Sequence, residues 1–70
     1  MAIGYKEQVN KIIITTNDGR KMLRQLGCYG LNILGNNYSY YDKYMQLHVL
    51  NMNHIKEIKL YNDKTLINVI

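Results

Sequence analysis

Turn-forming residues divide this chain into short runs. Glycine, asparagine and aspartate cluster at intervals of about eight to twelve residues. The clusters lie at residues 17–19, 27–30, 35–37, 51–53 and 62–64. In the first cluster an Asp-Gly pair separates two β-rich runs and favours a hairpin, because glycine accepts a positive φ without steric cost. This spacing predicts a small all-β barrel or sandwich.

The runs between the clusters have the composition of strands. Residues 9–16 are mostly β-branched, and apolar residues alternate with other residues in 29–34, 44–50 and 65–70, the last as an edge strand. Ile55, Ile58 and Leu60 slip out of this alternation by one residue, which indicates a β-bulge.

Residues 20–26 allow two interpretations. They contain good helix formers, and Asp18 and Gly27 could cap and end a short helix. As a strand they would give residues 9–16 the partner that the Asp-Gly turn needs, and we favour this reading. A helical turn could also begin residues 5–10. We therefore expect a mainly β fold, either a small SH3- or Sm-like barrel or a strongly bent antiparallel sheet, with room for one short helix.

The chain has 70 residues, which suits one domain spanning 1–70. A domain this short buries only about 60% of its unfolded surface, and the lone Cys28 cannot form an internal disulfide. We therefore expect a homo-oligomer. The longest apolar run is residues 12–14, and no apolar segment follows a basic start. These features predict a cytoplasmic protein without a membrane span.

Catalysis and metal binding have little support in the sequence. The five carboxylates lie far apart along the chain. Cys28 could act as a nucleophile with His48 or His54 as its base, but a lone cysteine behaves mainly as a small hydrophobic residue. One cysteine and two histidines do not match the ligand spacing of a closed zinc site. We expect a binding protein with no catalytic residue, metal or cofactor.

Basic residues give the chain a formal net charge of +4. Arg20, Lys21 and Arg24 lie within five positions. In a strand, Arg20 and Arg24 would share one face and Lys21 would take the other. Such a cluster can attract phosphates without reading sequence; the alternative is a solvated edge that resists aggregation.

Residues 38–44 contain four tyrosines. Strand alternation puts Tyr38 and Tyr40 on one face and Tyr41 on the other, with Lys43 nearby. Aromatic rings beside cations can stack on nucleic-acid bases, and tyrosines also anchor protein interfaces. A third interpretation is that they serve as core aromatics, since the chain has no Phe and no Trp.

A polar segment follows at residues 51–54. The amides of Asn51 and Asn53 could bond to base edges, and His54 could stack or bind phosphate. Simple turn formation is the alternative.

Two stretches resemble the Sm/Hfq-like family. Residues 11–20 are similar to its first strand and turn, and residues 49–58 to its second motif, where a loop leads into the final strand. The family's Asp-x-apolar-apolar-Asn element before the third strand is absent. The resemblance implies a ring of subunits joined through edge strands, with RNA or nucleotides near Asn51, Asn53 and His54. SH3-like barrels of other kinds fit nearly as well.

Two functions follow as hypotheses. The first is a non-catalytic, oligomeric module that binds nucleic acid or a nucleotide. Its candidate ligand-binding residues are Arg20, Lys21, Arg24, Tyr38, Tyr40, Tyr41, Lys43, Asn51, Asn53 and His54. The second is an inhibitor that binds a host protein through residues 38–44, of the anti-defence or anti-CRISPR type. The abundance of Ile, Asn, Lys and Tyr, whose codons are A/T-rich, fits a phage or mobile-element gene of this kind.

Overall fold

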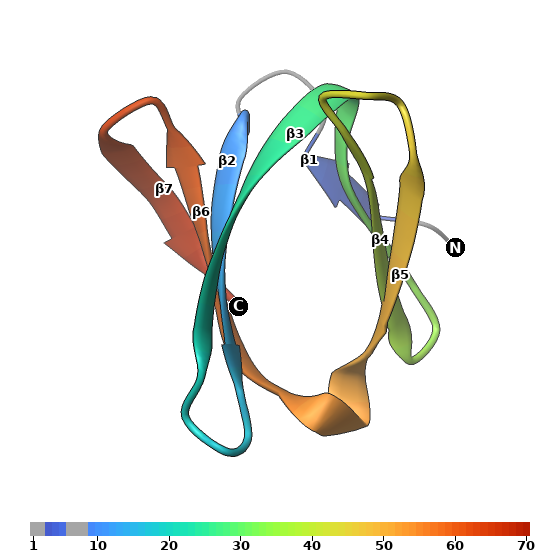
Figure 1. Cartoon of the computed structure of the whole chain (residues 1–70), viewed down its shortest axis with the longest axis vertical. Helices are drawn as coiled ribbons and strands as arrows, with labels where there is room; N and C mark the ends of the chain where they lie inside the picture. Colours follow the sequence, from blue (N-terminus) through green and yellow to red (C-terminus); the bar gives the residue numbers. More distant parts are fainter. Residues whose placement is uncertain (1–2, 6–8) are drawn as a thin grey trace.

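The computed structural model describes residues 3–5 and 9–70, with the side chains of residues 3–5, 28 and 29 excepted. The helical turn expected at residues 5–10 lies largely outside this part of the chain. The described residues form seven strands and one 3-10 helix (Figure 1). The elements are β1 (Ile3–Tyr5), β2 (Lys11–Thr16), β3 (Lys21–Leu34), β4 (Asn37–Asp42), β5 (Leu47–Asn51), η1 (Met52–His54), β6 (Ile55–Asn62) and β7 (Thr65–Val69).

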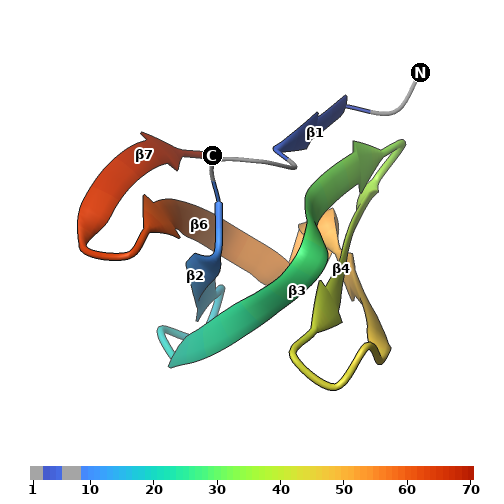
Figure 2. The same cartoon turned by 90° about the horizontal axis from the view of Figure 1, so that it is seen from above.

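The strands form one strongly curled antiparallel sheet in the order β5-β4-β3-β2-β6-β7, and β1 pairs with β3 beside this path. Figures 1 and 2 show that the sheet curls into an open half-barrel. The predicted fold class, mainly β with a strongly bent antiparallel sheet, is confirmed. Residues 20–26 contribute a strand and not a helix, because β3 begins at Lys21 and pairs with β2.

Three predicted turns are confirmed, and each has a residue in the left-handed region. Gly19 (φ 90°) lies between β2 and β3, Gly35 (φ 59°) between β3 and β4, and Asp63 (φ 54°) between β6 and β7. The reversal of the chain at these places produces the antiparallel hairpins of the sheet.

The predicted break at residues 27–30 is wrong. The chain does not turn back there; β3 continues through both glycines and bends, so that its two halves belong to the two sides of the half-barrel. The register with β4 shifts between Leu26 and Leu31. A Cβ on Gly27 would lie 2.6 Å from the backbone oxygen of Asp42. Gly27 therefore allows β3 and β4 to approach each other closely, and this role is different from forming a turn.

The predicted bulge in β6 is confirmed. Thr15 pairs with Glu57 and Thr16 with Ile55, which leaves Lys56 as the extra residue. The bulge turns Ile55 inward together with the buried Ile58.

The core occupies the inner face of the curled sheet. Alternate residues of β2 and β6 are buried there against residues of β3 and β4, as the alternation predicts. The buried apolar residues are Val9, Ile12, Ile14, Leu26, Leu31, Tyr40, Ile58 and Leu60. Since most of them face the interior from central strands, the outer face and the ends of the half-barrel remain available for binding.

Candidate nucleic-acid interface

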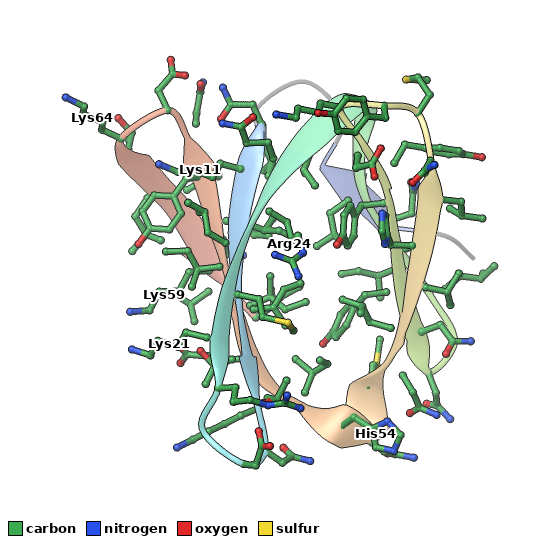
Figure 3. The ribbon with its side chains drawn as sticks, in the orientation of Figure 1. Lys11, Lys21, Arg24, His54, Lys59 and Lys64 are labelled. Atoms are coloured by element: carbon green, nitrogen blue, oxygen red, sulfur yellow. The ribbon has the colours of Figure 1, made fainter. Side chains whose placement is uncertain are left out.

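The structure scatters the predicted ligand-binding residues, and those near the ends of the half-barrel form two separate groups. Arg24 and Lys43 line one hollow, which reaches from the middle of the half-barrel, where Figure 3 shows Arg24, toward the end that carries the β4–β5 and β6–β7 loops (Figure 1). Arg20 and His54 line a hollow of about 310 Å³ at the other end, near the β2–β3 hairpin and η1. The ten residues therefore do not form one site.

The first end carries two adjoining hollows, of about 460 and 370 Å³, that share Gln25 and Lys43. We call them together the end groove. It lies where β3 parts from β4: β3 pairs with β4 at Leu26, whereas residues 21–25 pair only with β2. Its lining residues are Asn10, Lys11, Leu23, Arg24, Gln25, Leu26, Asp42, Lys43, Tyr44, Asp63 and Lys64.

Asp42 organises the loop that forms one wall of this groove. Its Oδ1 accepts hydrogen bonds from the backbone N–H groups of Tyr44 (2.8 Å) and Gln46 (3.0 Å), and its Oδ2 lies 2.8 Å from Nε2 of His48. The hydrogen bond from His48, followed by that from the Gln46 backbone, holds the pKa of Asp42 below its usual value. The carboxylate thus ties the loop back onto β5 and leaves Lys43 and Tyr44 at its tip.

Tyr44 is the most exposed of the large apolar and aromatic side chains described, with 73% of its surface accessible. The Lys43 Nζ lies 5.2 Å from the centre of its ring, within the range of a cation–π contact. Between them and β5, Met45 adopts a φ of 63°. The loop therefore presents an aromatic ring and a cation side by side in solvent.

The other tyrosines of this segment have different surroundings. Tyr40 is only 2% exposed and stacks on His48, with ring centres 4.9 Å apart and planes inclined by 12°. Burial raises the pKa of Tyr40, and the nearby Arg24 partly opposes this rise. Tyr38 packs against the core, whereas Tyr41 lies opposite Leu47 on the outer side. The predicted alternation is thus confirmed, and Tyr40 acts as a core aromatic whose faces are already covered.

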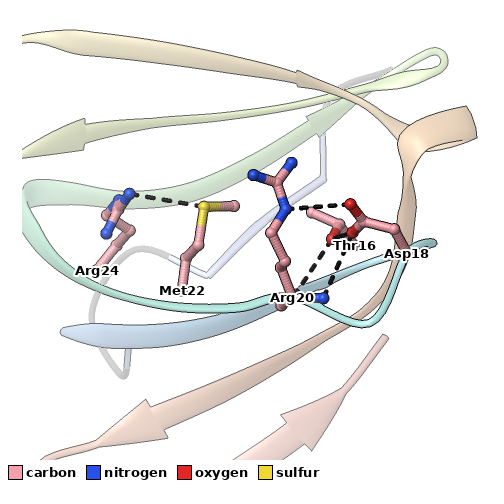
Figure 4. A network of polar contacts seen from close by, with 5 residues as sticks. All are labelled: Thr16, Asp18, Arg20, Met22 and Arg24. Carbon is pink, nitrogen blue, oxygen red and sulfur yellow. Dashed lines mark hydrogen bonds and ion pairs between the residues drawn. The ribbon is translucent and has the colours of Figure 1, made fainter.

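At the opposite end, the predicted residues are bonded to one another and to the turns. Arg20 Nε lies 3.1 Å from Oδ2 of Asp18, and the Thr16 hydroxyl donates to Asp18 (Figure 4). The Thr16 hydrogen bond is the main reason that the pKa of Asp18 is lowered. Arg20 directly precedes β3, and Figure 4 shows its side chain on the same side of the strand as those of Met22 and Arg24, as the alternation predicts. Arg24 bonds to Met22 Sδ and the Leu23 oxygen.

The polar segment 51–54 is explained largely by turn formation. The side-chain oxygen of Asn51 caps η1 by accepting from the Asn53 N–H at 2.8 Å. Asn17 Nδ2 donates to the Asn53 carbonyl oxygen at 2.6 Å, which ties η1 to the β2–β3 hairpin. His54 remains exposed beside this hairpin (Figure 3).

Three lysines that were not among the predicted ligand-binding residues extend the positive charge of the end groove. Lys11 and Lys64 line the groove, and Lys59 lies on the outer side of the sheet, where the predicted residue Lys21 also lies (Figure 3). Lys11 also lies 5.2 Å from the ring centre of Tyr61, its partner in the pairing of β2 with β6. Strand alternation could have placed Lys11 and Lys59 outward, but only the strand register brings them together.

The carboxylates described in the structure are engaged away from most of these lysines. Asp18 pairs with Arg20, Asp42 with His48, and Glu57 with Lys59 at 4.0 Å. Asp63 exchanges two hydrogen bonds of 2.9 Å with Asn10. Within residues 9–70, therefore, no carboxylate lies within ion-pair distance of the basic residues that line the end groove, which are Lys11, Arg24, Lys43 and Lys64.

The hypothesis that Cys28 acts with a histidine concerns a side chain outside those described. His48 is paired with Asp42. No three His, Cys, Asp or Glu side chains converge as metal ligands in the described part of the chain. None of the helices in that part of the chain is long and apolar enough to cross a membrane.

Comparisons with protein-family models, curated proteins and solved structures found no match. The candidate interface therefore rests on its own geometry.

Proposed function

We propose that this protein binds nucleic acid through the end groove and the lysines that continue from it. The observation that carries the proposal is that four cations from four segments line two adjoining hollows, Lys11, Lys43 and Lys64 the larger one and Arg24 and Lys43 the smaller one, with no described carboxylate within ion-pair distance of them. Asp42 and Asp63 also line the groove, but both are hydrogen-bonded to protein groups.

Phosphate binding explains why such an arrangement is useful. Cations without an acidic partner can neutralise backbone phosphates and release the counterions that surround nucleic acid. This contribution needs no base-specific contact, so it supports binding of many sequences. The Sm/Hfq-like resemblance and the expected oligomer belong to this proposal, since β5 and β7 are edge strands of the sheet. Sedimentation that finds a ring-sized assembly would support them, and a monomer would contradict them.

The experiment is a titration of a fluorescently labelled twelve-nucleotide strand at several salt concentrations. If four cations contact phosphates, the logarithm of the association constant should fall against the logarithm of salt with a slope of about −3. Replacing Lys11 and Lys64 together by glutamine should reduce the slope by about 1.4.

The matched control for the single variants Lys11→Gln and Lys64→Gln is Lys56→Gln, which likewise removes one charge, from the exposed bulge residue of β6 outside the groove. We expect it to change the slope much less than either single groove variant, each of which should reduce the slope by about 0.7. Absence of binding at low salt, a slope near zero, or equal effects of Lys56 and the groove lysines would refute the proposal.

A protein partner is the second candidate, favoured by a different surface. Leu47 and Val49 of β5 are 54% and 59% exposed on the outer face of the sheet. Exposed aliphatic residues on an edge strand are typical of protein interfaces. An inhibitor encoded by a phage or mobile element would use such a surface. A pull-down from host lysate after nuclease treatment separates the candidates: a stoichiometric protein that is retained, and lost with Val49→Asp, would support this one.

A further inference from the structure

We infer that the end groove takes a single-stranded segment of nucleic acid, with one base stacked on Tyr44 and a neighbouring phosphate held by Lys11 and Lys64. This inference rests on the proposed function and specifies its substrate. It assigns different tasks to the two hollows that share Gln25 and Lys43.

The smaller hollow has the chemistry of a base site. Its lining includes Tyr44, the aliphatic Leu23 and Arg24, beside Gln25, Asp42 and Lys43. Aromatic rings and guanidinium planes are the groups on which unpaired bases stack. Arg24 is partly held in place, because its guanidinium donates to the Leu23 oxygen at 2.9 Å and lies 3.6 Å from Met22 Sδ.

The larger hollow has the chemistry of a phosphate site. Its lining includes Lys11, Lys43 and Lys64 and the amides of Asn10 and Gln25, and its one carboxylate, Asp63, is hydrogen-bonded to Asn10. Its volume of about 460 Å³ is within the range of small-ligand pockets. Lys43 borders both hollows, so a nucleotide whose base lies on Tyr44 would place its backbone beside this lysine.

The loop holds Tyr44 ready for stacking. Asp42 accepts the N–H groups of Tyr44 and Gln46, and the Met45 N–H donates to the Asp42 backbone oxygen at 2.9 Å. Met45 adopts a φ of 63°, which side chains other than glycine seldom take. A large ring kept in solvent by such a fixed loop is better explained by a ligand than by packing.

These features favour a single strand over a duplex. A duplex already stacks both faces of its bases, so only its phosphates would be accessible and Tyr44 would contribute little. An unpaired base offers a free face, and stacking on an aromatic residue is sequence-tolerant. The site therefore suits single-stranded RNA or DNA of varied sequence.

The test compares wild type, Tyr44→Ala and Tyr44→Phe in binding to U12, dT12 and a twelve-base-pair duplex. Tyr44→Ala should weaken binding to at least one single strand about 5- to 100-fold, leave duplex binding within about twofold, and keep the wild-type circular dichroism. Tyr44→Phe should retain most of the affinity, because it keeps the ring. If Tyr44→Ala weakens binding to U12 and dT12 by the same factor, the site contacts only the bases and phosphates. A larger loss of affinity for U12 indicates an additional contact to the ribose hydroxyl.

A fluorescence measurement gives an independent readout. The chain has no tryptophan, so Tyr44→Trp places a single reporter at the stacking position. We expect a bound single strand to quench the fluorescence of this tryptophan, and a bound duplex to leave the fluorescence nearly unchanged. This inference would be overturned if binding depends on salt but is unchanged by Tyr44→Ala, or if the duplex quenches the tryptophan fluorescence as strongly as a single strand does. Either result would still be compatible with the proposed function. Absence of salt-dependent binding to any of the three nucleic acids would overturn both.

Discussion

Replacing Gly27 by alanine should destabilise the fold through one close contact. The added Cβ would lie 2.6 Å from the Asp42 backbone oxygen, 3.3 Å from Met45 Sδ and 3.4 Å from the Tyr41 backbone oxygen. Met45 can move, but Asp42 is fixed by its pairing with Leu26. An ordinary contact requires β3 and β4 to separate by about 0.8 Å. The strain falls on the strand junction that forms the end groove.

The magnitude follows from two opposing contributions. Overpacking of this kind costs about 1–3 kcal/mol. Alanine restricts the unfolded chain more than glycine does, which offsets about 0.4–1 kcal/mol. We expect a net loss of about 1–2 kcal/mol in the free energy of unfolding, or a Tm lower by about 5–15 °C for a domain of this size. The displaced Asp42 should also lower single-strand affinity, because it holds the loop of Lys43 and Tyr44.

Urea unfolding followed by circular dichroism measures this loss, and Gly35 provides the matched comparison. Gly35 has open space around its Cβ position but a φ of 59°. Asparagine tolerates that conformation, so Gly35→Asn should be nearly neutral, whereas Gly27→Asn should cost at least as much as Gly27→Ala. If Gly27→Ala is as stable as the wild type, the close approach of the two strands is not a constraint and the reasoning fails.

Substitutions at three further positions test the core and the loop. The Thr15 hydroxyl is buried without a hydrogen-bond partner among the described residues, so Thr15→Val should raise the free energy of unfolding by about 1 kcal/mol; a loss in urea titration would contradict this. Tyr40→Phe should keep the fold and the affinity for nucleic acid. Tyr40→Ala should lower the free energy of unfolding by about 3–5 kcal/mol, which thermal melts would show. A stable Tyr40→Ala protein with selectively weakened binding would instead make Tyr40 a ligand contact. The pKa of Asp42 is held below its usual value of 3.8, so its carboxylate stabilises the fold above about pH 4. This contribution disappears as the pH falls through the folded-state pKa. Asp42→Asn should flatten that part of a plot of stability against pH, and an unchanged plot would exclude the effect.

Local chemistry determined much of this architecture before any long-range contact is considered. Asn17, Asp18 and Gly19 specify a tight reversal by their own backbone preferences. The slipped spacing of Ile55 and Ile58 requires an extra residue if both are to face the core. The alternation in residues 38–41 likewise fixes which tyrosines point inward, because successive side chains of a strand take opposite faces.

The tertiary structure decided the rest. Gly27 looked like a place where the chain stops a strand, and only the approach of Asp42 shows that it lets one long strand continue and bend. The end groove joins Lys11, Lys43 and Lys64 from distant parts of the chain. Their meeting depends on the register of β2 with β6 and on the point where β3 leaves β4. Both result from packing between strands, and no short stretch of sequence encodes either one.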